Sequence, residues 1–202
     1  MRTTIDFADR TVRFTLVPIE AFDTRLKHPV SFVRACHVAV RFAGWYDLNG
    51  GRVWLPSGGF HATFGQLGEW FGCTRDAARR RIEGLERAGV VRRANTSPYV
   101  AYDCPAPAGS TWLVSGLFDA IEGGEDAPGA LVPLDPFYES HLINTPGDVS
   151  AYCRLCQAVQ RRGRLRRRDG HVVCWVRAGG TLLTLGELAK TLGTTKSSAR
   201  RT

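Results

Sequence analysis

Residues 52–81, RVWLPSGGFHATFGQLGEWFGCTRDAARRR, recur at residues 173–202 as VCWVRAGGTLLTLGELAKTLGTTKSSARRT, shifted by 121 positions without a gap. Eleven of the thirty pairs are identical: one tryptophan, four glycines, two threonines, one leucine, one alanine and two arginines. A shorter match joins residues 16–18 to residues 131–133, both Leu-Val-Pro, at a shift of 115. An internal repeat of this kind indicates two copies of one structural unit.

The repeat predicts two domains, residues 1–121 and 130–202, joined by a linker at residues 122–129. The linker sequence, EGGEDAPG, is rich in glycine, proline and acidic residues, as loops are. The change of shift requires an insertion in the second copy, and the arginine-rich stretch at 161–168 is the natural place for part of it. The chain ends at Thr202 inside the third helix of the second copy, so we expect either a fragment or a unit without its wing.

Hydrophobic periodicity and capping residues predict the elements of both copies. In the first copy we expect a strand at 12–17, helices at 30–42, 64–71 and 75–88, and strands at 53–55, 90–93, 99–102 and 111–114. In the second copy we expect helices at 149–160, 185–192 and from 196 onward, with a strand at 172–176 and a loop at 161–168. The predicted fold class is α+β, mainly α.

The segment from the second to the third helix has a physical reason at each matched position. Gly72 permits a sharp turn between the helices, and Thr74 caps the third helix. Ala78 is small enough for a close helix crossing, while Ile82 and Leu85 continue its apolar face. This pattern predicts a helix-turn-helix whose third helix keeps its other face polar and basic.

This segment resembles the helix-turn-helix of winged-helix DNA-binding proteins, and the tandem arrangement is similar to replication initiators of plasmids and phages. The resemblance implies two tandem winged helix-turn-helix domains, the second truncated at its recognition helix. It implies DNA contacts in the first copy from Thr74, Arg75, Asp76, Arg79 and Arg80, and from Arg92 and Arg93 on the wing. The second-copy counterparts are Thr195, Lys196, Ser197, Arg200 and Arg201.

The charge balance favours a nucleic-acid partner. The chain carries 27 Lys and Arg against 19 Asp and Glu, a net charge of +8, and only three of the basic residues are lysines. Arginine suits bidentate contact with phosphate and guanine, although a bias toward GC-rich codons would give the same excess. The arginines of the predicted loop, Arg161, Arg162, Arg164, Arg166, Arg167 and Arg168, form a candidate phosphate clamp.

Other chemistry finds less support. Cys153, Cys156, His171 and Cys174 have a spacing that zinc could use, but we prefer to interpret the cysteines as buried free thiols, and we predict no metal or cofactor. We also predict no enzymatic activity, because no nucleophile or carboxylate constellation is visible. Trp54 and the matching Trp175 are interpreted as core anchors.

These observations predict sequence-specific binding of double-stranded DNA, with replication initiation placed ahead of a repressor or partition regulator. The alternative of another class is a tandem winged-helix scaffold that binds proteins. Host replication proteins and a second copy of the chain are further candidate partners. The N-terminal segment has aspartates where a signal peptide needs an apolar run, and no apolar run is long enough for a membrane helix, so we expect a cytoplasmic protein without a membrane partner.

Overall fold

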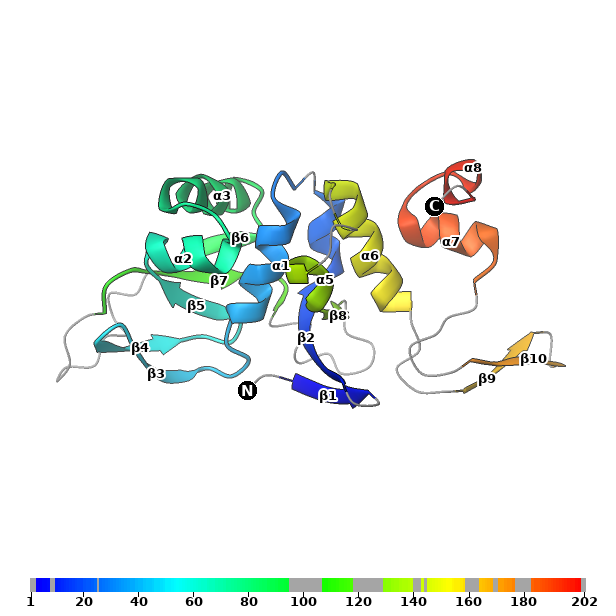
Figure 1. The fold of residues 1–202 in the computed structure, drawn as a ribbon, viewed down its shortest axis with the longest axis horizontal. Helices are drawn as coiled ribbons and strands as arrows, with labels where there is room; N and C mark the ends of the chain where they lie inside the picture. Colours follow the sequence, from blue (N-terminus) through cyan, green and yellow to red (C-terminus); the bar gives the residue numbers. More distant parts are fainter. Residues whose placement is uncertain are drawn as a thin grey trace.

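The structure, a computed structural model, describes residues 3–7, 10–24, 26–94, 107–117, 129–139, 143, 145–158, 164–168, 171–176 and 183–200. Helices combine with small antiparallel sheets, so the predicted α+β class is confirmed (Figure 1). None of the helices within these ranges has the length and apolar character needed to cross a membrane.

The elements of the first copy are β1 (Thr3–Phe7), β2 (Arg10–Pro18), the 3-10 helix η1 (Ile19–Asp23), α1 (Pro29–Val38), β3 (Gly44–Leu48), β4 (Gly51–Leu55), β5 (Gly59–Ala62), α2 (Phe64–Phe71), α3 (Arg75–Arg87), β6 (Val91–Ala94) and β7 (Ser110–Val114). Those of the second copy are β8 (Gly129–Pro133), α5 (Asp135–Glu139), α6 (Pro146–Ala158), β9 (Arg164–Arg168), β10 (His171–Val176), α7 (Leu185–Leu192) and α8 (Lys196–Ala199).

Local capping sets the limits of α2 and α3. The Thr63 side chain accepts from the Gln66 backbone N–H while Gln66 reaches back to the Thr63 N–H, which forms a capping box. Gly72 ends α2 with φ 60° and ψ 48°, a left-handed conformation that favours glycine. The Thr74 side chain then accepts from the Ala77 N–H and starts α3. These observed limits confirm the two predicted helices to within one residue.

The sheet beneath this helix pair has the strand order β5-β7-β6 and is antiparallel throughout. Strand β5, which the sequence did not predict, is entirely buried and pairs Phe60 with Trp112 of β7. Its buried His61 binds the Thr111 hydroxyl at 2.9 Å through Nδ1 and the Ala108 carbonyl at 3.1 Å through Nε2. This sheet covers the inner faces of α2 and α3.

Two first-copy predictions need correction. Helix α1 ends at Val38, not at residue 42, because the next residues enter the sheet region: the Val40 N–H donates to the Gly59 carbonyl and the Gly58 N–H donates to the Val40 carbonyl, both at 2.8 Å. The strand predicted at 53–55 is part of β4, which pairs with β3 in a separate two-stranded hairpin and does not belong to the β5-β7-β6 sheet. The strand predicted at 99–102 lies outside the described residues.

The repeated Leu-Val-Pro segments pair with each other. Strands β2 and β8 are antiparallel neighbours, and Leu16 stands opposite its own counterpart Leu131. Thr15 stands opposite Val132, and Val17 stands opposite Ala130. A shift of 115 takes Thr15 to Ala130 and Val17 to Val132, so exchanging the two copies converts one of these pairs into the other. A local twofold axis therefore passes between Leu16 and Leu131.

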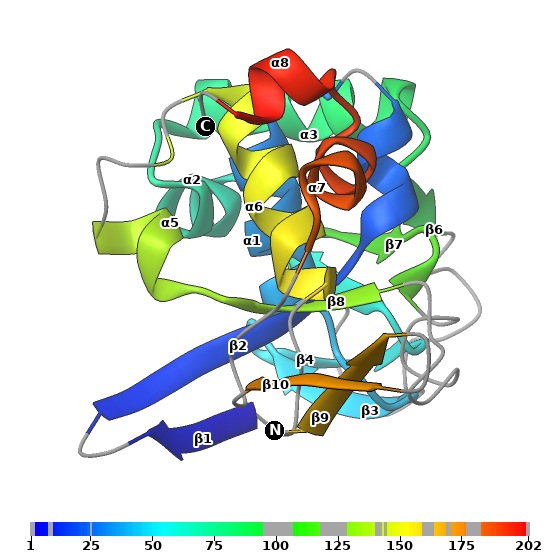
Figure 2. The ribbon, with the colours of Figure 1, turned by 90° about the vertical axis from the view of Figure 1, so that its right-hand side faces the viewer.

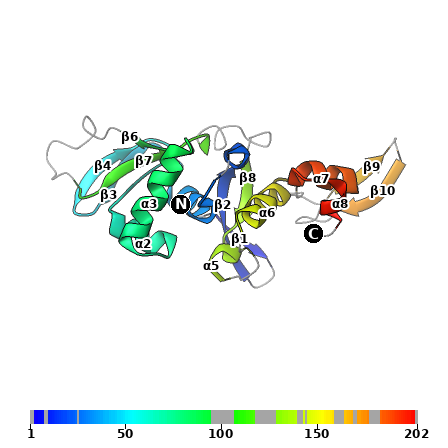
Figure 3. The same ribbon diagram turned by 90° about the horizontal axis from the view of Figure 1, so that it is seen from above.

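Contacts around these strands repeat on both sides of the axis. Phe22 and Phe32 pack edge to face with centroids 5.9 Å apart, and Phe137 and Tyr152 do so at 5.8 Å. Figure 3 shows α1 and α6 on either side of β2 and β8, with α2–α3 beyond one and α7–α8 beyond the other. The core is continuous across the predicted domain boundary, since Val17, Phe32 and Val132 belong to one buried cluster. Of the predicted linker, only Gly129 is described, and it begins β8.

The arginine-rich stretch contains a strand where we predicted a loop. Residues Arg164–Arg168 form β9 and pair with β10, as β3 pairs with β4 in the first copy. Leu165 opposite Trp175 matches Trp45 opposite Trp54, and the register of β10 shifts between Val172 and Cys174. That irregularity changes the offset between the copies from 120 to 121. Residues Arg164–Arg168 are therefore the counterpart of β3 and do not hold the part of the insertion that we expected there.

Candidate nucleic-acid interface

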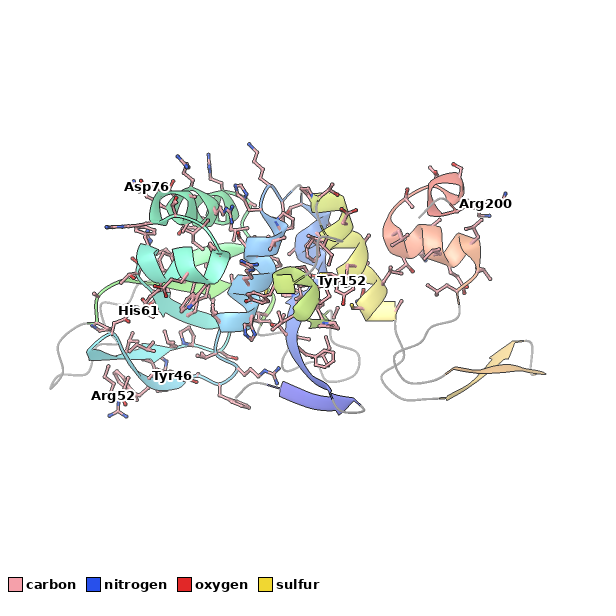
Figure 4. The ribbon with its side chains drawn as sticks, in the orientation of Figure 1. Tyr46, Arg52, His61, Asp76, Tyr152 and Arg200 are labelled. Carbon is pink, nitrogen blue, oxygen red and sulfur yellow. The ribbon has the colours of Figure 1, made fainter. Side chains whose placement is uncertain are left out.

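Helix α3 has one buried face and one exposed, mostly basic face. Ala78, Ile82 and Leu85 are at most 1% exposed and hold the helix on the core. The opposite side carries the predicted contact residues, all of them exposed: Thr74, Arg75, Asp76, Arg79 and Arg80. Figure 4 shows Asp76 at the outer edge of the molecule, away from the sheet. The helix can therefore meet a partner without disturbing the core.

Two arginines of α3 differ in how they are held. Arg79 Nε lies 2.9 Å from Glu83 Oε1, an exposed pair four residues apart on the same helix. Such a pair contributes only about 0.3–0.5 kcal/mol, so a phosphate or base could replace the carboxylate. Among the described residues Arg80 makes no ion pair, and its guanidinium stays open to solvent.

The two arginines that we predicted to lie on a wing are on β6, next to α3. Both Arg92 and Arg93 are exposed, as the predicted phosphate contacts require. Arg93 Nε is 3.9 Å from Glu86 Oε1, and its guanidinium lies 5.8 Å from the centre of the Trp112 ring. Residues 95–106, which connect β6 to β7, lie outside the described residues.

The second copy repeats the local geometry of the turn. Thr184 and Glu187 form the same capping box, and Gly193 is left-handed with φ 64°. The predicted contacts Thr195, Lys196 and Ser197 are exposed at the start of α8, and Arg200 is exposed directly after its last residue. Arg201 lies outside the described residues. Figures 1 and 2 place α3 and α8 along the same upper edge of the molecule.

The arginine-rich stretch does not join this edge. Figures 1 and 2 place the β9–β10 hairpin on the opposite, lower side, away from α3 and α8. Arg164, Arg166, Arg167 and Arg168 lie in β9, whereas Arg161 and Arg162 fall outside the described residues. One straight duplex held by both helices would therefore not reach this hairpin.

Between the two helix pairs the surface is also basic. Lys27, His28 and Arg81 line an open cavity of about 190 Å³ that Thr145 and Pro146 close from the second copy. Burial lowers the pKa of His28, and the nearby Arg81 and Lys27 charges lower it further. This cluster was not predicted, because it depends on the contact between copies and not on local spacing.

Arg34 is the most important residue that sequence reasoning missed. Its Nη2 donates to the Phe137 carbonyl at 2.6 Å and its Nη1 donates to the Trp70 carbonyl at 3.4 Å. The guanidinium also lies 4.5 Å from the centre of the Tyr138 ring. Arg34 thus ties the end of α2 to α5 of the second copy, and burial lowers its pKa. A single arginine within an apolar helix was the available signal.

Two further sequence interpretations concern the cysteines and the tryptophans. Cys153 and Cys156 lie on α6, where burial raises the pKa of Cys156 to about 11, while His171 and Cys174 lie on the distant β10. Within the described part of the chain, no group of three or more His, Cys, Asp or Glu is placed to hold a metal. Trp54 is only half-buried and packs on the exposed Trp45 at 5.7 Å, so the prediction that it anchors the core is wrong.

Comparison of the chain with protein-family models, with curated proteins and with solved structures gave no match.

Proposed function

We propose that the chain binds double-stranded DNA sequence-specifically through two winged-helix units. The observation that carries the proposal is α3: a helix with a fully buried apolar stripe, an exposed arginine face and a left-handed glycine turn before it. Apart from the β3–β4 hairpin that stands between α1 and β5, the order α1, β5, α2, α3, β6, β7 and the sheet order β5-β7-β6 support a winged-helix arrangement for the first unit.

The second unit supports the same proposal through its position. Because α3 and α8 lie along one edge, a duplex running along that edge meets both helices. The N-terminal turns of such helices meet base edges in the major groove, and guanine is the base that arginine recognises best. Lys27 and Arg81, which line the cavity on the side of α3 that faces the second copy, add positive charge where phosphates of the same duplex would pass.

Within this class the proposal places replication initiation first and transcription repression or partition regulation second, acting in the cytoplasm. Two fixed DNA-reading units suit an initiator that engages repeated sites and then recruits host replication proteins. Footprinting on the DNA that flanks the gene separates the roles: several spaced repeats support an initiator, and a single site over the promoter supports a repressor.

Affinity across a salt series tests DNA binding itself. The association constant of the intact chain for a duplex should fall linearly on a log–log plot against salt, because each neutralised phosphate releases counterions. An affinity that does not depend on salt would favour the protein-binding scaffold. Replacing Arg166, Arg167 and Arg168 with Ser is a matched control, since their hairpin lies on the other edge and the salt slope should not change.

A further inference from the structure

The two copies are related by an approximate twofold axis, and this relation is built into their packing. Equivalent residues Leu16 and Leu131 face each other in the central strand pair, and pairs on either side of them are images. A flexible linker would leave the orientation of two units open. Here five consecutive residue pairs, from Phe14 with Pro133 to Pro18 with Gly129, fix it.

Side chains that cross the axis do so reciprocally. Arg34 of α1 donates to the Phe137 carbonyl in the second copy, and Arg154 of α6 lies 2.6 Å from Asp23 Oδ1 in the first copy. Arg154 is the counterpart of Arg34 at the shift of 120 that also relates β9 to β3. Phe137 is the counterpart of Phe22 at the shift of 115, and Phe22 precedes Asp23 in the sequence. Each first helix is therefore fastened to the short helix of the opposite copy.

The two helix pairs, α2–α3 and α7–α8, are related by the same approximate twofold axis. Viewed from above in Figure 3, α2–α3 and α7–α8 lie on opposite sides of the central strands, and Figure 1 shows α3 and α8 on one edge. The axis therefore runs from the central strands toward the edge that carries both helices. A duplex has twofold axes perpendicular to its length, so protein and DNA axes can coincide when both helices enter the major groove.

We infer that a single chain reads two half-sites in inverted orientation, on opposite strands, and not a direct repeat. This inference rests on the proposed function. Arg79 and Arg200 are matched residues on the two helices, so both half-sites should present the same base to them at symmetric positions. The second copy has Lys196 and Ser197 where the first has Arg75 and Asp76. The bases that these residues contact should therefore differ between the two half-sites, which makes the site an imperfect palindrome.

The twofold relation within one chain sets how many chains a palindromic DNA site should bind. A palindrome usually indicates a dimer, one subunit to each half-site. Here one chain already contains the twofold relation, so one chain per palindrome is the expected stoichiometry.

Selection of sites from random duplexes, followed by native mass spectrometry, tests the inference with the intact chain. We expect an enriched imperfect palindrome bound by one chain. Replacing one half-site by its reverse complement, at constant spacing, should lower affinity roughly tenfold to a hundredfold, since most base contacts on that side become mismatched. Arg79→Ala and Arg200→Ala should each relax base preference at one of two symmetric positions.

The outcomes separate the inference from the proposed function. Enrichment of a direct repeat, equal affinity for both arrangements, or two chains on one palindrome would overturn the inference and leave sequence-specific DNA binding standing. If no sequence is enriched and affinity does not respond to salt, the proposed function fails and the inference fails with it.

Discussion

The two helix pairs, α2–α3 and α7–α8, share their local chemistry. Thr63 and Thr184 both form capping boxes, and Gly72 and Gly193 both end their helices in the left-handed conformation. These features depend on neighbouring residues alone, which explains why they occur in both copies.

The packing of the same two pairs differs. In the first, Leu67, Phe71 and Ile82 are at most 2% exposed, because the β5-β7-β6 sheet covers them. In the second, Ala189 is the buried hydrophobic residue of α7, while Leu185 is 41% exposed. The comparison shows that the caps and the turn are specified locally, whereas the burial of the first pair comes from its packing against the rest of the first copy.

The largest difference between the copies should appear in stability. Ile82→Ala removes a fully buried side chain and leaves a cavity, which should lower the free energy of unfolding by about 2–5 kcal/mol. Leu188→Ala, at a half-buried position of α7, should cost about 1 kcal/mol or less. Urea denaturation followed by circular dichroism measures both. Equal losses would show that α7 is as well packed as α3.

The next largest difference should appear in DNA affinity, which compares α3 with α8 as the proposed DNA-reading helices. Replacing Arg79 and Arg80 together with Ala should weaken specific binding by about 1–3 kcal/mol for each base interaction that is removed, with the fold retained because both residues are exposed. Arg200→Ala should weaken binding by the equivalent of about one such interaction. Fluorescence anisotropy on the selected site measures both effects. Unchanged affinity in a normally folded double variant would exclude α3 as the reading helix.

The two arginines that bond to the opposite copy, Arg34 and Arg154, should contribute unequally to the free energy of unfolding. Arg34→Met removes charge-assisted bonds to two backbone carbonyls in a half-buried site, which should cost about 1.5–3 kcal/mol. Arg154→Met breaks one pair with Asp23, whose side chain is 68% exposed, and should cost about 0.2–1 kcal/mol. Denaturation of both variants provides the measurement. A larger loss for Arg154 would mean that the second copy supplies the stronger contact.

The sequence predicts what is local and misses what depends on pairing. The limits of α2 and α7 were predicted correctly because caps and turn glycines mark them. Strand β5 was missed because Gly59–Ala62 is buried on both faces and shows no alternation. Strand β9 was missed because a run of arginines looks like a solvated loop until β10 pairs with it.

The features of the candidate site divide in the same way into those that the sequence predicts and those that depend on contact between the copies. The exposed face of α3 could be predicted, since its buried stripe follows the helical period. The pairing of β2 with β8 could not, because the repeated Leu-Val-Pro segments indicate equivalence but not contact. Arg34 and the Lys27, His28 and Arg81 cluster depend on that contact, so no spacing rule reveals them.

The smallest expected effect is a pH dependence that belongs to the first copy. Burial lowers the pKa of His61 from its ordinary value of 6.5, although bonds to the backbone near Ala108 oppose this. The folded chain therefore favours the neutral imidazole, while the unfolded chain takes up a proton near pH 6.5. The stabilisation from His61 is complete above that pH and is lost as the pH falls toward the lowered folded value.

His61→Gln tests this dependence, because an amide can replace the bonds to Thr111 and the Ala108 carbonyl but does not titrate. The position matched in the second copy is Leu182, so the repeat offers no second group of this kind. His28, whose pKa is also lowered, requires the parallel variant His28→Gln as a control. Urea midpoints at pH 7.5 and 5.0 should lie closer together in His61→Gln than in the unmodified chain. An identical acid loss in both would assign the sensitivity to His28 or to the carboxylates.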